Sequence, residues 1–451
     1  MSRIIRPLNA LAVFIAFVLT PVWLRIPAAY ALSPLYIGRF LLLIPMLIAI
    51  VLWLIAGLPG LTSLRRTLWA GMWAALLLSY ALWGFFSQSW AFMSASKPEI
   101  AANAALQFGI VALFALVTAS GVLSPRRLLL ALSLSLAFNA ALATAQALTQ
   151  GDLGLRALGE FPFSPRSRGA SILIADGLRY VRPYGLLPHP NILAGVLLPG
   201  LFAASALILG DRSRFLRWFG VAALSLGTAA LLLTFSRAAW LGAAGGALVF
   251  LLLALPVLCA DLWGRGASRS LLPTLVASAA LVGAVFIGFV VRYTPFISAR
   301  AGIGEESLEL RSVSDRIVFT NFALRAIRER PLLGVGVGNL PWRASDYLRD
   351  EFYDLQGDYV HQIYLAAAAD LGLIGLALYG GALVCGMIAG IRAVRASRGV
   401  ERTVRAALLS AALAFMIIGL FDHYPYTLLQ PQTAFWGCLA AALTPSFQAT
   451  A

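Results

Sequence analysis

The histidines are the residues best suited to act as a catalyst in this sequence. There are three, His189, His361 and His423. Histidine changes its charge near neutral pH, which suits it to act as a general base. His361 stands out because a polar, acidic stretch ends at His361-Gln362 and a long apolar run follows directly. A base at such a boundary could act on a substrate held at a membrane surface. Interfacial packing is the alternative interpretation for each histidine, and it weighs most for His423.

Three arginines are placed to bind an anion. Arg237 lies between two apolar runs, where a charge is costly and marks a candidate functional site. Arg316 begins a predicted helix, and Arg182 lies in Val181-Arg182-Pro183. The planar fork of a guanidinium matches phosphate oxygens, so several arginines that converge would suit a diphosphate. The alternative for each is a solvated side chain, or one that extends to the membrane interface.

Other motifs that could carry chemistry are weaker. Gly334, Gly336 and Gly338 lack the Lys-Ser/Thr pair of a phosphate-binding P-loop, so they predict a tight turn and not a nucleotide site. Asp370 lies nine residues after His361 in an apolar run, where it should face protein, but it is not an obvious partner of His361. The HExxH, CxxC and GxSxG patterns are absent from the sequence, which offers no metal site. The cysteines all fall in apolar runs, as buried thiols do: Cys259, Cys385 and Cys438.

The composition predicts a polytopic helical membrane protein. Of the 451 residues, 60% are hydrophobic and 12% are charged, whereas soluble domains have about 25% charged residues. Runs of roughly 20 apolar residues match a hydrocarbon core about 30 Å thick, and they do not alternate as barrel strands would. We therefore expect an all-α bundle of about twelve spans. The expected spans are residues 8–24, 40–57, 68–86, 101–122, 128–148, 190–209, 218–235, 238–260, 271–291, 361–389, 405–421 and 433–446.

The distribution of charge predicts the orientation of these spans. The net charge of +15 comes largely from arginines that flank the spans; a basic helix or aromatic platform that would bind nucleic acid is not evident. The basic residues concentrate in alternate connections if the N-terminus is cytoplasmic, as the positive-inside rule requires. Both termini are then cytoplasmic, the first span is retained and not cleaved, and all three histidines lie at the outer boundary.

Two predicted outer loops, residues 149–188 and 292–360, are too long to be simple connectors. In the second, Ser314-Asp315 can cap a helix that ends near residue 329, and Pro341 can begin another that ends near Leu355. We expect a small helical cap on the outer face. The predicted organisation is nine spans within residues 1–291, the cap loop within 292–360, and three spans within 361–451.

These motifs together resemble the O-antigen ligase and polymerase family of bacterial membrane glycosyltransferases. The resemblance covers most of residues 180–440, and its most specific part is His361-Gln362 followed by Gly372 and Gly375. Three further segments resemble family motifs: an arginine motif at Arg237 to Leu241, the segment from Arg316 to Gly336 that leads into a glycine turn, and a signature of one branch in Arg182-Pro183-Tyr184-Gly185 with His189-Pro190-Asn191.

The resemblance implies both a fold and a reaction. The fold would be a GT-C-like bundle of transmembrane helices in the bacterial inner membrane, with its active face in the periplasm. The reaction would transfer a glycan from an undecaprenyl-diphosphate carrier to an acceptor hydroxyl, without a nucleotide sugar, metal or other cofactor. His361 would be the base, and Arg237, Arg316 and Arg182 would bind the diphosphate. Further candidates for the site are His189, Asn191, Gln362, Asp370 and His423.

The acceptor remains open at this point. A ligase of lipopolysaccharide assembly would use lipid A-core, and a polysaccharide polymerase would use a second lipid-linked repeat unit. A transporter of lipid-linked glycan is the alternative of another class. Transporters place ionisable residues near the membrane midplane, whereas the predicted spans hold essentially one acid, Asp370.

Overall fold

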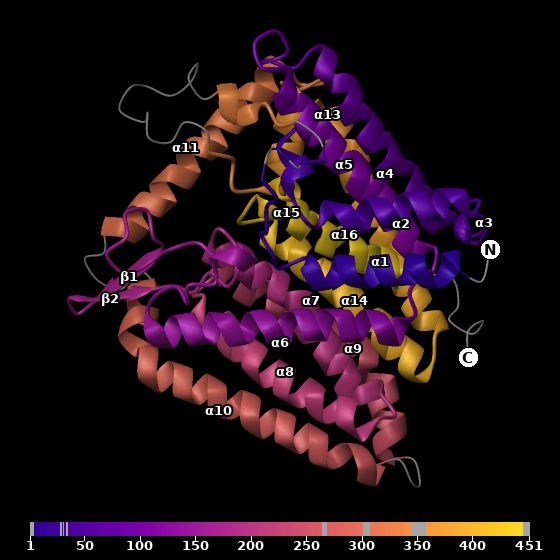
Figure 1. Cartoon of the computed structure of the whole chain (residues 1–451), viewed down its shortest axis with the longest axis vertical. Helices are drawn as coiled ribbons and strands as arrows, with labels where there is room; N and C mark the ends of the chain where they lie inside the picture. Colours follow the sequence, from indigo (N-terminus) through magenta and orange to yellow (C-terminus); the bar gives the residue numbers. More distant parts are fainter. Residues whose placement is uncertain are drawn as a thin grey trace.

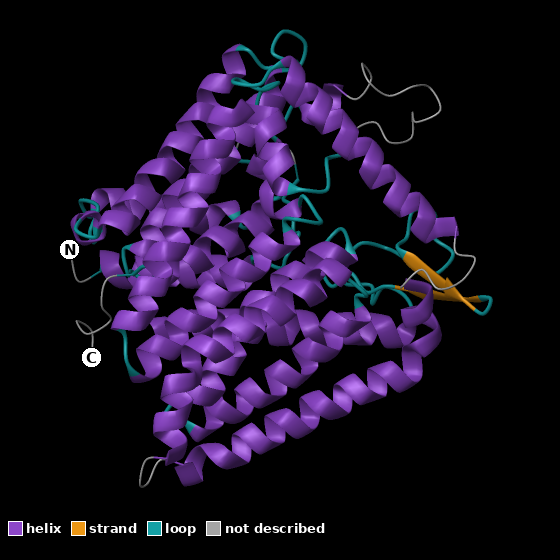
Figure 2. Cartoon of the chain, turned by 180° about the vertical axis from the view of Figure 1, so that it is seen from behind, coloured by secondary structure: helices purple, strands orange, loops and turns teal. Residues whose placement is uncertain are grey.

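Helices make up most of the computed structural model, as the apolar runs predict (Figure 2). The structure describes residues 4–27, 29, 31–32, 35–263, 268–300, 307–343 and 358–444, and it describes no side chains for 258–263, 268–270 and 307–313. The helices are α1 (Ile5–Leu19), α2 (Leu43–Ile55), α3 (Leu61–Arg65), α4 (Leu68–Phe86), α5 (Pro98–Ala119), α6 (Pro125–Thr149), α7 (Pro190–Gly210), α8 (Arg214–Leu233), α9 (Arg237–Trp263), α10 (Ser268–Arg300), α11 (Ser307–Glu329), α13 (Ile363–Ala396), α14 (Gly399–Ile418), α15 (Tyr424–Thr427) and α16 (Leu429–Ala442).

Each of the twelve predicted spans overlaps one of these helices. Eight helices in the described part of the chain are long and apolar enough to cross a membrane, and α1 and α2 are shorter apolar helices. The chain is therefore a membrane protein, but the span count supported by length and composition is lower than the predicted twelve. The two described thiols, Cys385 and Cys438, are free and buried, as predicted.

The helices surround a central layer formed by α7, α14 and α16 (Figure 1). In the hydrophobic part of α7, 89% of the residues are buried within the protein, whereas only 17% are buried in that of α10, which lies at the periphery (Figure 1). An apolar helix with so little protein contact needs lipid to cover it. The two ends of the chain lie on one side of the molecule, and α11 lies on the opposite side (Figure 1).

One element departs from the all-α expectation. Strands β1 (Ile172–Ala175) and β2 (Leu178–Val181) form an antiparallel hairpin within the predicted loop 149–188. The turn between them is Asp176-Gly177, in which both residues have positive φ, 51° and 72°. This dipeptide is a strong hairpin signal, because the favoured two-residue turn requires positive φ at both positions. The hairpin lies at the same end of the molecule as α11 (Figure 1).

The expected helix from residue 314 to 329 is present as the second part of α11. Its buried side chains, Phe319, Phe322, Ala323 and Ala326, belong to the main hydrophobic core, and the helix packs against α13. The second expected helix, from Pro341 to Leu355, begins as a short 3₁₀ turn at Leu340–Arg343. The rest of that prediction lies outside the described residues.

Helix α13 is interrupted at Gly372, where the backbone has φ 69° and ψ −174°. This conformation is essentially restricted to glycine. The interruption frees carbonyl groups of the helix, and the backbone of the glycine turn uses them. The Val335 N–H donates to the Ala369 carbonyl at 2.9 Å, and the Gly336 N–H donates to the Asp370 carbonyl at 2.8 Å. The glycines of residues 334–338 therefore form a tight turn, as predicted, and this turn is joined to the first part of α13.

We predict that Gly372→Ala destabilises the protein, by about 1–3 kcal/mol from the backbone conformation alone. A Cβ at residue 372 would lie 2.0 Å from the Leu332 carbonyl oxygen, which adds to this cost. Thermal unfolding in detergent should show an apparent Tm lower by several degrees. Gly380→Ala is the matched control in the same helix, because a Cβ there meets no atom within 4 Å. Equal melting of the two variants would contradict the assigned role of Gly372.

Candidate active site

His361 lies directly before the N-terminus of α13, where the predicted loop meets the apolar helix. Gln362 is the N-cap of that helix, and its Oε1 accepts a hydrogen bond from the Leu365 N–H at 2.9 Å. The Ile363 N–H donates to the Gly419 carbonyl at 2.8 Å, which fixes this segment to the end of α14. Gln362 is therefore explained by the structure of the helix start. His361 is left to point away from α13.

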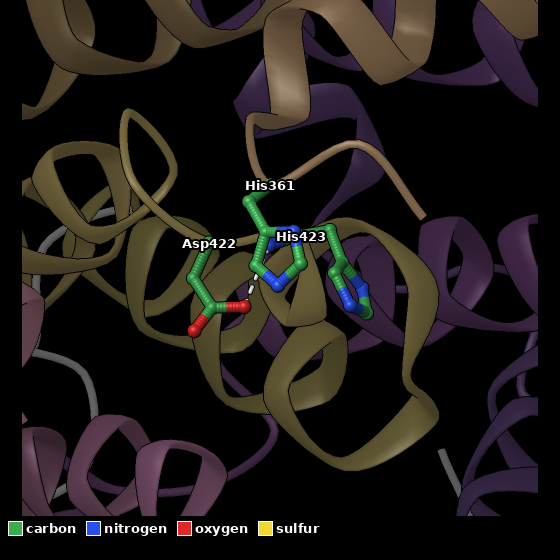
Figure 3. Close-up of side chains that lie close together, drawn as sticks. All are labelled: His361, Asp422 and His423. Carbon is green, nitrogen blue, oxygen red and sulfur yellow. Dashed lines mark hydrogen bonds between the residues drawn. The ribbon is translucent and has the colours of Figure 1, made fainter. Parts of the chain in front are cut away.

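His361 faces Asp422 and His423, which belong to the turn between α14 and α15 (Figure 3). The rings of His361 and His423 are edge to face, with centroids 5.3 Å apart. One ligand-type atom from each of the three side chains lies within 4.8 Å of the others. The Nδ1 of His361 is buried and has no hydrogen-bond partner among the described residues. The imidazole is thus held beside a carboxylate, with one nitrogen uncommitted.

Asp422 is the acid at the centre of this group and is only 5% exposed. Its Oδ1 accepts from the backbone N–H of His423 at 2.9 Å, and its Oδ2 accepts from Asn191 Nδ2 at 3.0 Å. Burial raises the pKa of Asp422, but the nearby histidines and the hydrogen bond from Asn191 outweigh burial, so the net pKa lies below its ordinary value. The side chain is therefore a carboxylate at neutral pH. Sequence reasoning missed Asp422, although an acid directly before His423 at a predicted boundary was a usable signal.

His423 is a neutral imidazole in this environment. Its Nδ1 lies 2.8 Å from Thr427 Oγ1. Burial lowers the pKa of His423 to about 4, and this effect exceeds the opposing influence of Asp422. One side of the ring contacts His361, and Tyr359 lies on another side with its ring centroid 5.7 Å away.

Asn191 links Asp422 to Arg182, and this link brings two distant loops together. The Asn191 Oδ1 accepts from Arg182 Nη2 at 2.5 Å, while its Nδ2 donates to Asp422. Arg182 also donates to Ser171 Oγ at 2.9 Å and to the Thr234 carbonyl. Burial lowers its pKa to about 10, so the guanidinium stays charged at neutral pH. Three nitrogens of Arg182 therefore donate to protein acceptors. Since these donors are already engaged, Arg182 is a weaker candidate than expected for direct contact with a diphosphate.

Arg237 and Arg316 approach the same site from α9 and α11. Burial lowers the pKa of Arg316; the charge of Asp422 raises it, and the charge of Arg237 lowers it further. Arg316 is therefore within electrostatic reach of both. Arg237 Nη1 donates to the carbonyl of Arg300 at 2.9 Å, and Arg300 Nε donates to the Phe235 carbonyl at 3.3 Å. Arg300 is a further cation that sequence reasoning did not single out, although it lies in the long predicted loop.

His189 has a structural explanation. It is the N-cap of α7, and its Nδ1 accepts from the Asn191 N–H at 3.1 Å. Burial, together with the charge of Arg182, lowers the pKa of His189 to about 3. The neutral ring is required, because only an unprotonated Nδ1 can accept this hydrogen bond. His189 therefore positions Asn191.

Asp370 does not contact His361, in agreement with its sequence spacing. Its carboxylate accepts from the backbone N–H groups of Gly338 and Leu340, both at 3.1 Å. It also accepts from the hydroxyl groups of Tyr359 and Tyr426. Since Tyr359 is two residues before His361, Asp370 fixes the segment that leads to the histidine. Asp370 is thus linked to the candidate base through Tyr359 and not by direct contact.

The group of His361, Asp422 and His423 also consists of residue types that bind divalent metal ions. Imidazole nitrogens and a carboxylate are the usual protein ligands of zinc, and a catalytic zinc site often has three of them. The sequence motifs did not predict this arrangement, because its members come from two segments about 60 residues apart. Both carboxylate oxygens of Asp422 already accept hydrogen bonds from protein N–H groups. A metal ion bound to this carboxylate would have to share the oxygens with those donors.

We predict that acid destabilises the protein partly through His189. The unfolded chain takes up a proton on this residue near pH 6.5, while the folded state resists protonation to about pH 3. The unfolded state therefore binds more protons between these values, and stability falls as pH falls below about 6.5. His189→Asn keeps an N-cap acceptor that does not titrate. Its apparent Tm should match the wild type at pH 7.5 and fall less at pH 4.5. Parallel Tm–pH curves would contradict this assignment.

Comparison with known proteins supports the sequence motifs. Residues 221–380 match the family model described as O-antigen ligase. The matched segment includes Arg237, Arg316, His361 and the interrupted helix at Gly372, whereas Arg182 and Asp422 lie outside it. No curated protein matches the chain. The match over residues 221–380 supports the O-antigen ligase family that the sequence motifs predicted.

Proposed function

We propose that the protein is a membrane glycosyltransferase that moves a glycan from a polyprenyl-diphosphate carrier to the hydroxyl group of an acceptor. The observation that carries the proposal is the position of His361. Its imidazole lies beside the Asp422 carboxylate, and Arg316 interacts electrostatically with that carboxylate and with Arg237. A base and fixed cations at one site match the two needs of this reaction, within a chain whose matched family is described as O-antigen ligase.

In the proposed step, His361 takes the proton of the acceptor hydroxyl as its oxygen forms a bond to the anomeric carbon of the donor glycan. The bond between that carbon and the diphosphate oxygen breaks, and its electron pair leaves with the diphosphate. Arg237 and Arg316 stabilise the negative charge that develops there, because fixed donors cost no reorganisation as the reaction proceeds. Asp422 stabilises the imidazolium that forms on His361, as a carboxylate does beside a catalytic histidine.

The place of this chemistry is the outer face of the bacterial inner membrane. The candidate site lies away from the chain ends, which the positive-inside rule assigns to the cytoplasm. A lipid carrier fits a site at the ends of the helices, because the polyprenyl chain can remain in the bilayer while the diphosphate meets the arginines. The acceptor is lipid A-core for a ligase of lipopolysaccharide assembly, and a second lipid-linked repeat unit for a polymerase. The profile of surface polysaccharide in a deletion strain separates the two: lipid-linked polymer accumulates without a ligase, and single repeats on core remain without a polymerase.

We predict that His361→Ala lowers the rate of glycan transfer by about 10²–10⁴, the usual contribution of a general base. The measurement uses purified protein in liposomes with a polyprenyl-diphosphate-linked glycan and either acceptor. Added imidazole should restore part of the activity, and the melting curve reports that the variant is folded. Transfer at the wild-type rate would remove His361 from the mechanism. Wild-type protein that moves the donor across the bilayer without new glycosidic bonds would instead identify a transporter.

We also propose that the reaction needs no metal ion, despite the ligand types gathered around His361. Transfer by the wild type should continue at an unchanged rate after dialysis against EDTA, because the arginines supply the positive charge for the leaving diphosphate. The same sample should contain less than about one-tenth equivalent of zinc, manganese or magnesium by elemental analysis. Loss of activity in EDTA, with recovery on addition of one of these ions, would show that the three side chains hold a catalytic metal.

A further inference from the structure

A second feature adjoins the candidate site. It is a cavity of about 570 Å³ that is open to the outside, a size typical of small-molecule pockets. One face of α5 lines it, together with the 3₁₀ turns Tyr36–Arg39 and Leu340–Arg343, the glycine turn and α15. The lining includes Tyr36, Glu99, Asn103, Trp342, Tyr359 and Thr427.

Two successive contacts link this cavity to His361. Tyr359 and Thr427 line the cavity, and both contact His423, through the Tyr359 ring and through Thr427 Oγ1. The His423 ring in turn contacts the His361 ring, with centroids 5.3 Å apart. A molecule that occupies the cavity is therefore separated from the proposed base by a lining side chain and His423, and the described lining of the cavity does not include Arg182, Arg237 or Arg316.

The lining has the chemistry of a site for a neutral polyhydroxyl compound. Among the described residues that line it, the charged groups are one cation, Arg39, and two acids, Glu99 and Asp370. With Lys97 beside Trp342, these groups give an anion no surplus of positive charge. Asp370 is already fully hydrogen-bonded to protein groups. Glu99 is exposed at the first turn of α5, and its carboxylate can accept hydrogen bonds from hydroxyl groups.

Contacts within the protein fix the orientation of an amide and an aromatic ring that line the cavity. The Asn103 Oδ1 accepts from the Ile37 N–H at 2.7 Å, which fixes the amide, and no described residue accepts from its Nδ2. Trp342 is 41% exposed and Tyr36 is 45% exposed, and Lys97 holds the indole ring from 4.4 Å. A sugar ring presents one face of C–H bonds and a rim of hydroxyl groups, which match an exposed aromatic face and a row of amide and carboxylate groups.

We infer that this cavity binds the sugar of the acceptor, and that Trp342, Glu99 and Asn103 recognise it. The inference rests on the proposed function, since it assigns the donor to the arginines and the acceptor to the cavity. The anionic diphosphate of the donor lies on the arginine side, and the uncharged hydroxyl groups of the acceptor enter from the cavity. The alternative occupant is an acyl or polyprenyl chain.

Photocrosslinking tests the occupant directly. A benzophenone amino acid replaces Trp342 in the full chain, which also carries His361→Ala so that bound acceptor is not consumed. Trp218 is the control position, because it is 46% exposed and lies at the start of α8. The probes are purified lipid A-core and an undecaprenyl-diphosphate-linked repeat unit. We expect crosslinks from position 342 to acceptor sugar and none from position 218. Crosslinks only to lipid chains, or equal labelling at both positions, would overturn the inference.

Kinetics provide the second measurement. Trp342→Ala and Glu99→Gln should each raise the KM for the acceptor by about fivefold or more and leave the KM for the donor unchanged, as loss of an aromatic or hydrogen-bonding contact predicts. Trp218→Ala should change neither value. An equal rise in both KM values would overturn the assignment of the cavity to the acceptor. A wild type that forms no glycosidic bond would refute the proposed function, and crosslinking alone would then decide whether the cavity binds sugar.

Discussion

The hydrogen bonds around the interruption of α13 are the constraint on which the candidate site depends. Gly372 breaks the helix, and the carbonyls of Ala369 and Asp370 then accept from the glycine turn. The Asp370 carboxylate accepts hydrogen bonds from two backbone N–H groups of the same turn and from the hydroxyl of Tyr359. A buried carboxylate is costly unless its oxygens are satisfied, so turn, helix and Tyr359 stabilise one another. The segment that ends in His361 is fixed as a result.

A second constraint is electrostatic. Asp422 is a buried acid in a region that contains three histidines and several arginines, and Asn191 connects it to Arg182. Burial works against charge on both Asp422 and Arg182, and the bridging amide lets both remain ionised without direct contact. The donor groups of Arg182 are engaged in these hydrogen bonds within the protein. Under the proposed function, Arg237 at the start of α9 and Arg316 within α11 are better placed for a substrate that brings its own negative charge.

The sequence predicted the parts of this site that are local in the chain. Each span predicted from hydropathy overlaps a helix of the structure. The change from polar to apolar residues at His361 marked the start of α13. The turn at residues 334–338 followed from its glycines. The contact of Asn191 with Asp422 could not be predicted, because it joins residues 231 positions apart and nothing in either segment specifies the other. The β1–β2 hairpin is a different case, since Asp176-Gly177 is a hairpin signal that the prediction of a long loop at residues 149–188 did not use.

The separation of charge across His361 bears on the choice of acceptor. A polymerase must accommodate two carrier diphosphates at once, whereas a ligase binds one carrier and one acceptor without that group. Among the described residues, four arginines interact electrostatically with one another, and none of them lines the cavity: Arg182, Arg237, Arg300 and Arg316. The described lining of the cavity has one cation, Arg39, and two acids, Glu99 and Asp370, and Lys97 adds a cation beside Trp342. Under the proposed function, a second diphosphate placed there would gain no net positive charge from these groups, so this arrangement favours an acceptor whose reactive end is a neutral sugar.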